Sequence, residues 1–137
     1  MQAAIESKIK CLGRGIVGSP PGPSQAFAVH ALTHPALDEQ VGDRLGELRR
    51  RHSVLTECLA SLSTDKIAPF PFNSGSFALL QIAPEIPVDA LRERLLEAST
   101  GVISVPEVNA IRLAYCSMHA DAIPALVQAI DQAVSSF

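Results

Sequence analysis

The stretch Asn109–Ser117, "NAIRLAYCS", places one arginine in a run that otherwise has the pattern of a buried strand. Ile111, Leu113 and Tyr115 alternate, so they fall on one face of an extended chain and Arg112 falls on the other. A guanidinium in that position must reach solvent, pair with an acid of the protein or bind an anion from outside. The residues alone leave two interpretations open, an exposed arginine on a strand face or a carboxylate-binding residue.

His52 is the polar member of an apolar stripe that runs from Leu37 to Leu62 in steps of three or four residues. This spacing predicts one face of a long helix. The position would suit a catalytic base, or a histidine at the edge of the core that is held by a hydrogen bond. The second interpretation is favoured, because no other chemically active residue of the helix converges on His52.

Two further groups resemble metal-ligand sets but are incomplete. His30 and His34 are four residues apart, which would put both on one helix face, yet no third ligand follows nearby. Cys11, Cys58 and Cys116 are odd in number and widely spaced, so neither a disulfide framework nor a zinc site is expected. We therefore expect no bound metal.

The composition is that of a globular domain. The chain has 137 residues, 47% of them hydrophobic, with a formal net charge of −3 and a pI near 5.7. This charge gives no electrostatic reason to bind nucleic acid or an anionic membrane. The apolar runs are too short to span a bilayer, and the N-terminus lacks the apolar centre of a secretory signal. We expect a cytoplasmic protein.

The first part of the sequence is predicted to be helical, with a proline-rich break. Apolar residues three or four apart mark a short helix over about residues 2–12. The prolines within residues 20–23 prevent its continuation. Ser24 is a suitable N-cap for a second helix, which Pro35 ends, and the long helix of the His52 stripe follows. The run of arginines in that long helix is interpreted as a solvated face.

The second part alternates between strand and helix patterns. "SFALLQI", "GVISV" and "AIRLAY" indicate three strands. "VDALRERLLEAS" indicates a helix with Leu91, Leu95 and Leu96 turned inward. A last helix begins near His119, because Pro124 is tolerated only in a first turn.

This order of elements predicts an α+β fold. We expect a small mixed sheet of about three strands, covered by helices and preceded by the long helix. Residues 1–34 hold the first helix, the proline-rich segment and the short helix. Residues 35–137 form the domain that the long helix introduces.

Several stretches, taken in order, resemble the C-terminal (small) domain of fold-type I aminotransferases, the pyridoxal-phosphate (PLP) enzymes of the aspartate and aromatic aminotransferase kind. "RGIVGSPPGPSQ" resembles a segment in which an arginine precedes a proline pair. "HALTHPAL" with "ELRRRHSVL" resembles the helix that leads into the small domain. "NSGSFALLQI" and "GVISVPEVNAIRLAYCSM" resemble its glycine-to-aromatic strand and the strand that bears the substrate arginine. The resemblance extends from about Ile9 to Val134.

The resemblance implies roles for two arginines. Arg112 matches the arginine that binds the α-carboxylate of the amino or keto acid, a bidentate interaction that suits the planar guanidinium. Arg14 matches an arginine that, in members using dicarboxylates, reaches the distal group of the substrate across a dimer. The residues between Arg14 and Pro20 depart from that pattern, so a structural or solvent-exposed Arg14 is an equal alternative.

The resemblance also implies what this chain lacks. In the family, the lysine that forms the Schiff base with PLP lies in the large domain, with the rest of the cofactor site. "ESKIK" resembles the lysine segment only faintly, because 12 residues separate Lys8 from Pro20 and the family has several times that spacing. We therefore expect no catalytic or cofactor-binding residue here, and no PLP bound by this chain alone.

Three functions remain open. The first is the C-terminal domain of a PLP-dependent aminotransferase, a truncated gene product that is inactive in transamination alone. Its partners would be a substrate carboxylate and either the missing large domain or further copies of the chain, since an uncovered apolar surface predicts self-association into an oligomer. The second is a standalone module that binds an amino acid or a partner. The third is a small α+β interaction domain, whose strand order would differ from that of the family.

Overall fold

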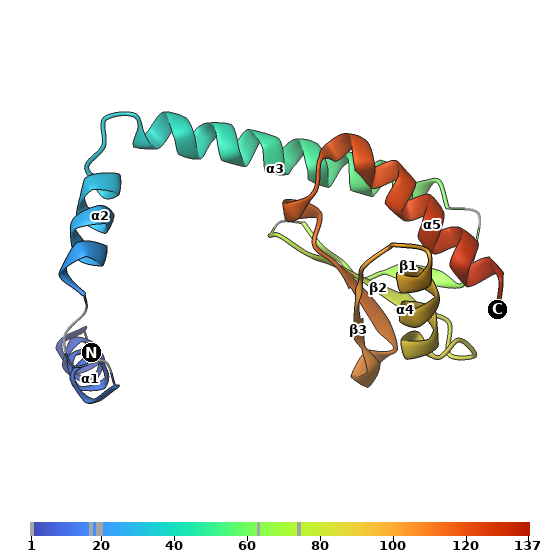
Figure 1. The fold of residues 1–137 in the computed structure, drawn as a ribbon, viewed down its shortest axis with the longest axis horizontal. Coiled ribbons are helices and arrows are strands. Elements are labelled where there is room, and N and C mark those ends of the chain that lie inside the picture. Colours follow the sequence, from blue (N-terminus) through green and yellow to red (C-terminus); the bar gives the residue numbers. More distant parts are fainter. Residues whose placement is uncertain (1, 17, 19–20, 63, 74) are drawn as a thin grey trace. The chain divides into compact units, whose positions relative to one another are not determined.

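The structure is a computed structural model that describes residues 2–137 except 17, 19, 20, 63 and 74. By its internal contacts the chain divides into two compact units, Met1–Asp43 (unit 1) and Arg44–Phe137 (unit 2). The helix α3 begins in the first unit and ends in the second (Figure 1). Within the described residues, no helix is both long enough and apolar enough to cross a membrane.

Unit 1 consists of helices. The predicted first helix is longer than expected, since α1 spans Gln2–Ile16. The second helix, α2 (Gly22–Leu32), begins before the predicted cap, because Pro21 occupies the N-cap position and Ser24 lies in the first turn. A proline is tolerated in a first turn, where its missing N–H would have no partner in the helix. Neither α1 nor α2 has a buried residue.

The long helix is confirmed as α3, which spans Leu37–Ala60. Only the C-terminal part of its apolar stripe is buried, through Leu55 and Leu59. Val41 and Leu45, on the same stripe, each remain 47% exposed. The sequence pattern therefore predicts the helix correctly, whereas the depth to which the stripe is buried varies along it.

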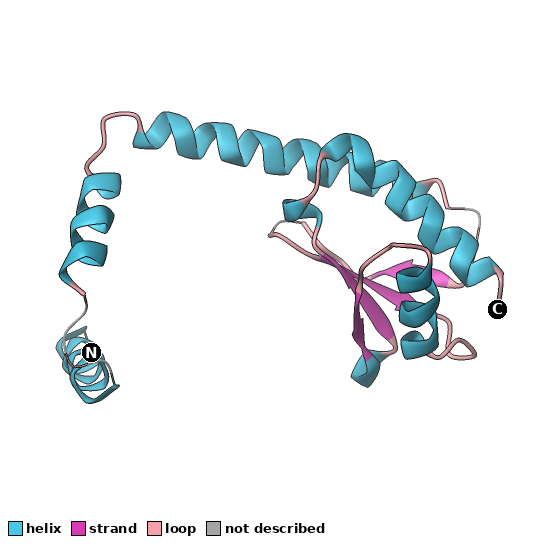
Figure 2. Cartoon of the chain, in the orientation of Figure 1, coloured by secondary structure: helices cyan, strands magenta, loops and turns pink. Residues whose placement is uncertain are grey.

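Unit 2 contains a four-stranded sheet, drawn in magenta in Figure 2. Its order is β1 (Ile67–Pro69), β2 (Ala78–Ile82), β4 (Ala110–Leu113) and β3 (Ile103–Val105), and every neighbouring pair is antiparallel. The α+β class is confirmed, but the expected mixed sheet is antiparallel throughout. No strand is predicted over β1, because its Pro69 argues against one. A proline is acceptable there because β1 lies at the edge of the sheet.

Helices cover one face of this sheet and form the core with it. α4 (Val88–Glu97), α5 (Ile123–Ser135) and the end of α3 supply apolar side chains to the same cluster as the strands. Leu91 and Leu95 are buried as predicted, but Leu96 is 59% exposed, because the next residue along a helix points about 100° away from its predecessor. α5 begins at Ile123, four residues later than predicted, after a short 3₁₀ turn, and Pro124 lies in its first turn.

Asn109 joins three parts of unit 2. It adopts a left-handed conformation with φ of 45°, directly before β4. Its side-chain Nδ2 lies 3.0–3.1 Å from the carbonyl oxygens of Ile82, Ala83 and Ile86, and its Oδ1 accepts a hydrogen bond from the amide of Val88. This one side chain thereby holds the end of β2 and the start of α4 beside β4.

Candidate functional site

Arg112 lies on the sheet face that the helices do not cover. Across the sheet it pairs with Leu79 of β2 and Ile103 of β3. The strand residues on either side of it, Ile111 and Leu113, are buried in the core on the opposite face. The alternation predicted from the sequence is therefore confirmed, and it places the guanidinium away from the core.

The environment of Arg112 answers part of the question that the sequence raised. Among the described residues, no carboxylate forms an ion pair with it. Its Cζ lies 4.7 Å from the centre of the Phe77 ring, so the guanidinium stacks on an aromatic face. Its Nε is buried and has no hydrogen-bond partner in the described chain. A half-buried cation without an acid partner has donors available for an external anion.

Phe77 was not recognised from the sequence as a site residue. It stands immediately before β2, beside Ala78, which pairs with Leu113 of β4. The available signal was the aromatic residue at the start of a strand, but the pairing of β2 with β4 is needed to bring that ring beside Arg112. No local pattern specifies this pairing.

Two interactions fix the segments that flank the Arg112–Phe77 pair. The Tyr115 hydroxyl, at the end of the Arg112 strand, donates a hydrogen bond of 2.7 Å to the carbonyl oxygen of Gly75. Burial raises the pKa of the Tyr115 hydroxyl, and the neighbouring Cys116 adds to the shift, so the group remains a protonated donor. The loop before Phe77 is thus tied to the segment after Arg112.

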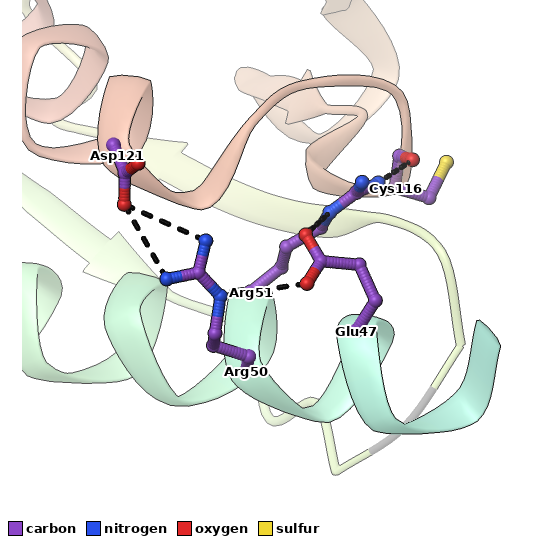
Figure 3. Close-up of polar contacts among 5 residues, drawn as sticks. All are labelled: Glu47, Arg50, Arg51, Cys116 and Asp121. Atoms are coloured by element: carbon purple, nitrogen blue, oxygen red, sulfur yellow. Dashed lines mark hydrogen bonds and ion pairs between the residues drawn. The ribbon is translucent and has the colours of Figure 1, made fainter. Parts of the chain in front are cut away.

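The second interaction joins the segment after Arg112 to α3 (Figure 3). Arg51 donates to the carbonyl oxygen of Cys116 and, at 2.9 Å, to Glu47. The hydrogen bond from Arg51 lowers the pKa of the Glu47 carboxyl, against the opposing effect of burial. The interpretation of the arginine run as a uniformly solvated face is therefore wrong for Arg51, whose side chain is only 17% exposed. The interpretation as a solvated face holds better for Arg50, whose side chain is 54% exposed. Its Nη1 lies 3.4 Å from Oδ1 of the exposed Asp121.

Arg14, the second predicted substrate residue, lies exposed in the last turn of α1. It belongs to unit 1, whereas Arg112 belongs to unit 2. Among the described residues of α1, none is buried, so this helix does not enclose Arg14 in a binding site. Its role in binding a distal carboxylate stays a prediction.

The histidines are placed as follows. His52 is half-buried at the edge of the core, with its ring centre 5.1 Å from that of Phe72 and 6.2 Å from that of Tyr115. The expected hydrogen bond to it is missing at one nitrogen, because Nε2 is buried and has no partner in the described chain. His30 and His34 stack edge to face at 5.8 Å, and no cluster of three metal-ligating side chains was found among the described residues.

Several solved structures that this chain resembles in fold are aminotransferases. The α-aminoadipate aminotransferase LysN of Thermus thermophilus, complexed with N-(5'-phosphopyridoxyl)-L-leucine, matches 99% of this chain with a TM-score of 0.81 and 16% identity. The kynurenine aminotransferase of Pyrococcus horikoshii matches 97% with a TM-score of 0.82 and 13% identity. The multiple substrate aminotransferase of Thermococcus profundus matches 95% with a TM-score of 0.81 and 16% identity.

This chain has an aminotransferase fold. The match covers 36%, 35% and 34% of those three proteins, so the chain spans about a third of their length. The sequence itself matches no protein-family model and no curated protein. The third hypothesis from the sequence expected a strand order different from that of the family, and this expectation is wrong because the fold matches.

The described residues do not form a site for PLP. Lys8 and Lys10 lie exposed on α1, and Lys66 is half-buried before β1. A shallow groove beside Lys8 is lined by residues of α1 itself, so no second element contributes a group to hold a cofactor. A Schiff-base lysine needs a pocket that positions it and activates it. We therefore derive no step of PLP chemistry from these residues.

Proposed function

We propose that this chain is the small-domain part of a PLP-dependent aminotransferase, and that Arg112 binds the α-carboxylate of its amino or keto acid. The observation that carries the proposal is the state of Arg112. Its guanidinium stacks on Phe77, lacks an acid partner among the described residues and lies on the uncovered face of the sheet. A planar fork of donors fixed by stacking is well suited to a carboxylate.

The surroundings of Arg112 favour an incomplete site over a self-contained binding module. Two cavities of unit 2, of about 380 and 480 Å³, are lined by other residues and include neither Arg112 nor Phe77. A small-molecule site normally encloses most of its ligand. The proposal is therefore that a large domain, supplied by the same or another chain, closes over Arg112 and brings the cofactor.

The exposed apolar residues of unit 1 support the same need for a covering partner. Ile9, Leu12 and Ile16 of α1 are all exposed, as are Phe27 and Leu32 of α2. Exposed apolar faces of this kind mark interaction surfaces in soluble proteins. The missing large domain or a second copy of the chain would cover them in this proposal.

Carboxylate binding at Arg112 can be tested on the chain as it is. We would titrate it with 3-methyl-2-oxobutanoate, a small keto acid, and follow by NMR the backbone amide signal of Phe77, whose ring contacts Arg112. The expected result is a saturable shift that disappears in Arg112→Gln and is at least about tenfold weaker in Arg112→Lys, which cannot bind bidentately. Arg14→Gln is the matched control, and it should leave this signal unchanged.

Two outcomes would contradict the carboxylate role. The neutral ketone 3-methyl-2-butanone could give the same shift, or the keto acid could perturb Arg112→Gln as strongly as the unaltered chain. The cofactor part is tested separately, by incubation with PLP, reduction with borohydride and mass spectrometry. Scattered, substoichiometric labelling is expected, whereas a stoichiometric adduct on Lys8 or Lys10 would show that the chain carries its own PLP site.

A further inference from the structure

A cavity of about 480 Å³ in unit 2 lies apart from Arg112. One face of α3 forms most of its wall, and Tyr115 and the loop before β2 complete it. The α3 residues that line it are Leu45, Leu48, Arg49, His52 and Ser53. Their spacing of three and four residues puts them on one side of the helix. Its volume falls within the range of about 300–1,000 Å³ that is usual for small-molecule sites.

Two nitrogen groups in this wall have no partner in the described protein. The Nε2 atom of His52 is buried and makes no hydrogen bond there, a situation that is unfavourable for a polar atom. The guanidinium of Arg49, one helical turn before it, forms no hydrogen bond or ion pair with any described residue. Residues three apart on a helix are neighbours on its surface, so both groups can reach one ligand.

The charge of the wall favours an anion. Its described residues include no aspartate or glutamate, and Arg49 supplies a positive charge. The nearest acid in the sequence, Glu47, is already engaged by Arg50 and Arg51. Since Arg51 also bonds the carbonyl of Cys116, Glu47 is held in a different network (Figure 3). An acid with a net negative charge would therefore meet donors and no competing carboxylate in this wall.

Apolar and aromatic side chains form part of the remaining wall, beside Ser53, Asn73 and Gly75. Leu45, Leu48 and Tyr115 supply this part of the lining. The Tyr115 hydroxyl donates its proton to Gly75 and so is not free to donate to a ligand. A short hydrocarbon body suits such a wall better than a bare inorganic anion does.

We propose that this cavity is a second anion site, which binds a small monocarboxylic acid. Arg49 and the Nε2–H of His52 hold the carboxylate, and the hydrocarbon part lies against Leu45 and Leu48. The site is independent of the function proposed for Arg112, because it shares neither Arg112 nor Phe77. Its occupation would place a ligand against Tyr115, the residue that ties the end of the Arg112 strand to the Phe77 loop.

The test uses isobutyrate as the probe, with NMR of the 137-residue chain as the readout. We expect saturable shifts of the His52 ring nitrogens and of the amides of Leu48 and Ser53. Arg49→Gln should weaken binding at least about tenfold, the effect of losing one charge-assisted hydrogen bond. Arg44→Gln is the matched control, since Arg44 is also exposed on α3 but does not line the cavity. Binding that survives in Arg112→Gln would separate this site from the one proposed above.

Further measurements test whether the cavity selects a carboxylate with a hydrocarbon body. Isobutyramide, which has the same shape without the charge, should bind much more weakly, and inorganic phosphate should not compete. Equal binding of isobutyramide, competition by phosphate, or an equal loss of binding in Arg44→Gln would each overturn the proposal. His52→Gln provides a second variant, and its melting curve shows whether a loss of binding reflects a loss of fold. Shifts confined to residues outside the cavity would also refute the site.

Discussion

Apolar residues of similar kinds are buried in unit 2 and exposed in unit 1. In unit 2 the apolar side chains of the strands and helices form one cluster, whose members are nearly all inaccessible to solvent. In unit 1 the helices α1 and α2 have no buried residue, although Ile5, Ile9 and Leu12 follow a helical spacing. The difference shows that an amphipathic pattern specifies a helix but does not supply the surface that buries it.

The sheet is what makes unit 2 different. It presents Leu80, Ile82 and Ile111 on one face, and three helices pack against that face. Each helix thereby buries its stripe against side chains that are distant in sequence. Unit 1 has no strand among its described residues, so its helices have no such platform within the unit.

The strongest test of this comparison is a pair of leucine truncations, one in each unit. Leu55→Ala removes a side chain that is fully buried in the unit 2 core and should lower the free energy of unfolding by about 2–5 kcal/mol. Leu12→Ala removes an exposed side chain of α1 and should change it by less than about 0.5 kcal/mol. Tyr115, the single tyrosine in a chain without tryptophan, reports unit 2 by its fluorescence during urea unfolding. An equal loss of unfolding free energy in both variants would contradict the difference between the two units.

A smaller effect is expected at Asn109, where unit 2 depends on one polar side chain. Asn109→Ala leaves the carbonyls of Ile82, Ala83 and Ile86 without their side-chain donor and should cost about 2–3 kcal/mol. Asn109→Gly should recover about 1 kcal/mol of this, because glycine tolerates the left-handed conformation. The urea midpoint of the Tyr115 fluorescence measures both.

Unit 1 offers the control for this experiment. Gly18 also has a positive φ, of 74°, so Gly18→Ala strains a left-handed residue outside unit 2. Its Tyr115 transition should match that of the unaltered chain. A full recovery in Asn109→Gly would instead show that backbone conformation, and not the hydrogen bonds, determines the stability at Asn109.

The smallest expected effect is a difference in stability between variants of two neighbouring arginines of α3, Arg50 and Arg51. Arg51→Gln removes a poorly exposed donor to the Cys116 carbonyl and should lower the stability of unit 2 by about 1–2 kcal/mol. Arg50→Gln breaks a contact between exposed groups and should cost less than about 0.5 kcal/mol. Thermal unfolding at low and high salt distinguishes them, since the Arg50 contribution is screened. A larger loss in Arg50→Gln would mean that the tie shown in Figure 3 depends on Asp121 and not on Cys116.

The sequence predicted helices correctly where the apolar residues keep one helical spacing along the segment. The stripe of α3, the buried face of α4 at Leu91 and Leu95, and Pro124 in the first turn of α5 were all confirmed. The failures have local causes. The sequence predicts no strand over β1 because its Pro69 opposes one, and the predicted cap at Ser24 is wrong because Pro21 occupies the N-cap position.

The candidate site was predictable only in part. The alternation around Arg112 identified an unneutralised charge on a strand face, and the structure confirms that placement. Phe77 and Arg51 escaped because their contacts with the Arg112 segment join residues far apart in the chain. Such contacts depend on strand pairing and helix packing, which a local pattern does not encode.

The sequence by itself determined the α+β class, the long helix and the side of the strand on which Arg112 lies. These follow from backbone geometry, since the periods of helix and strand fix which residues share a face. Only the tertiary structure decided which faces are covered. It buries the end of α3, leaves the helices of unit 1 exposed and brings Phe77 to Arg112. The physical reason is that burial is a property of two surfaces in contact, and one of them is always elsewhere in the chain or in another molecule.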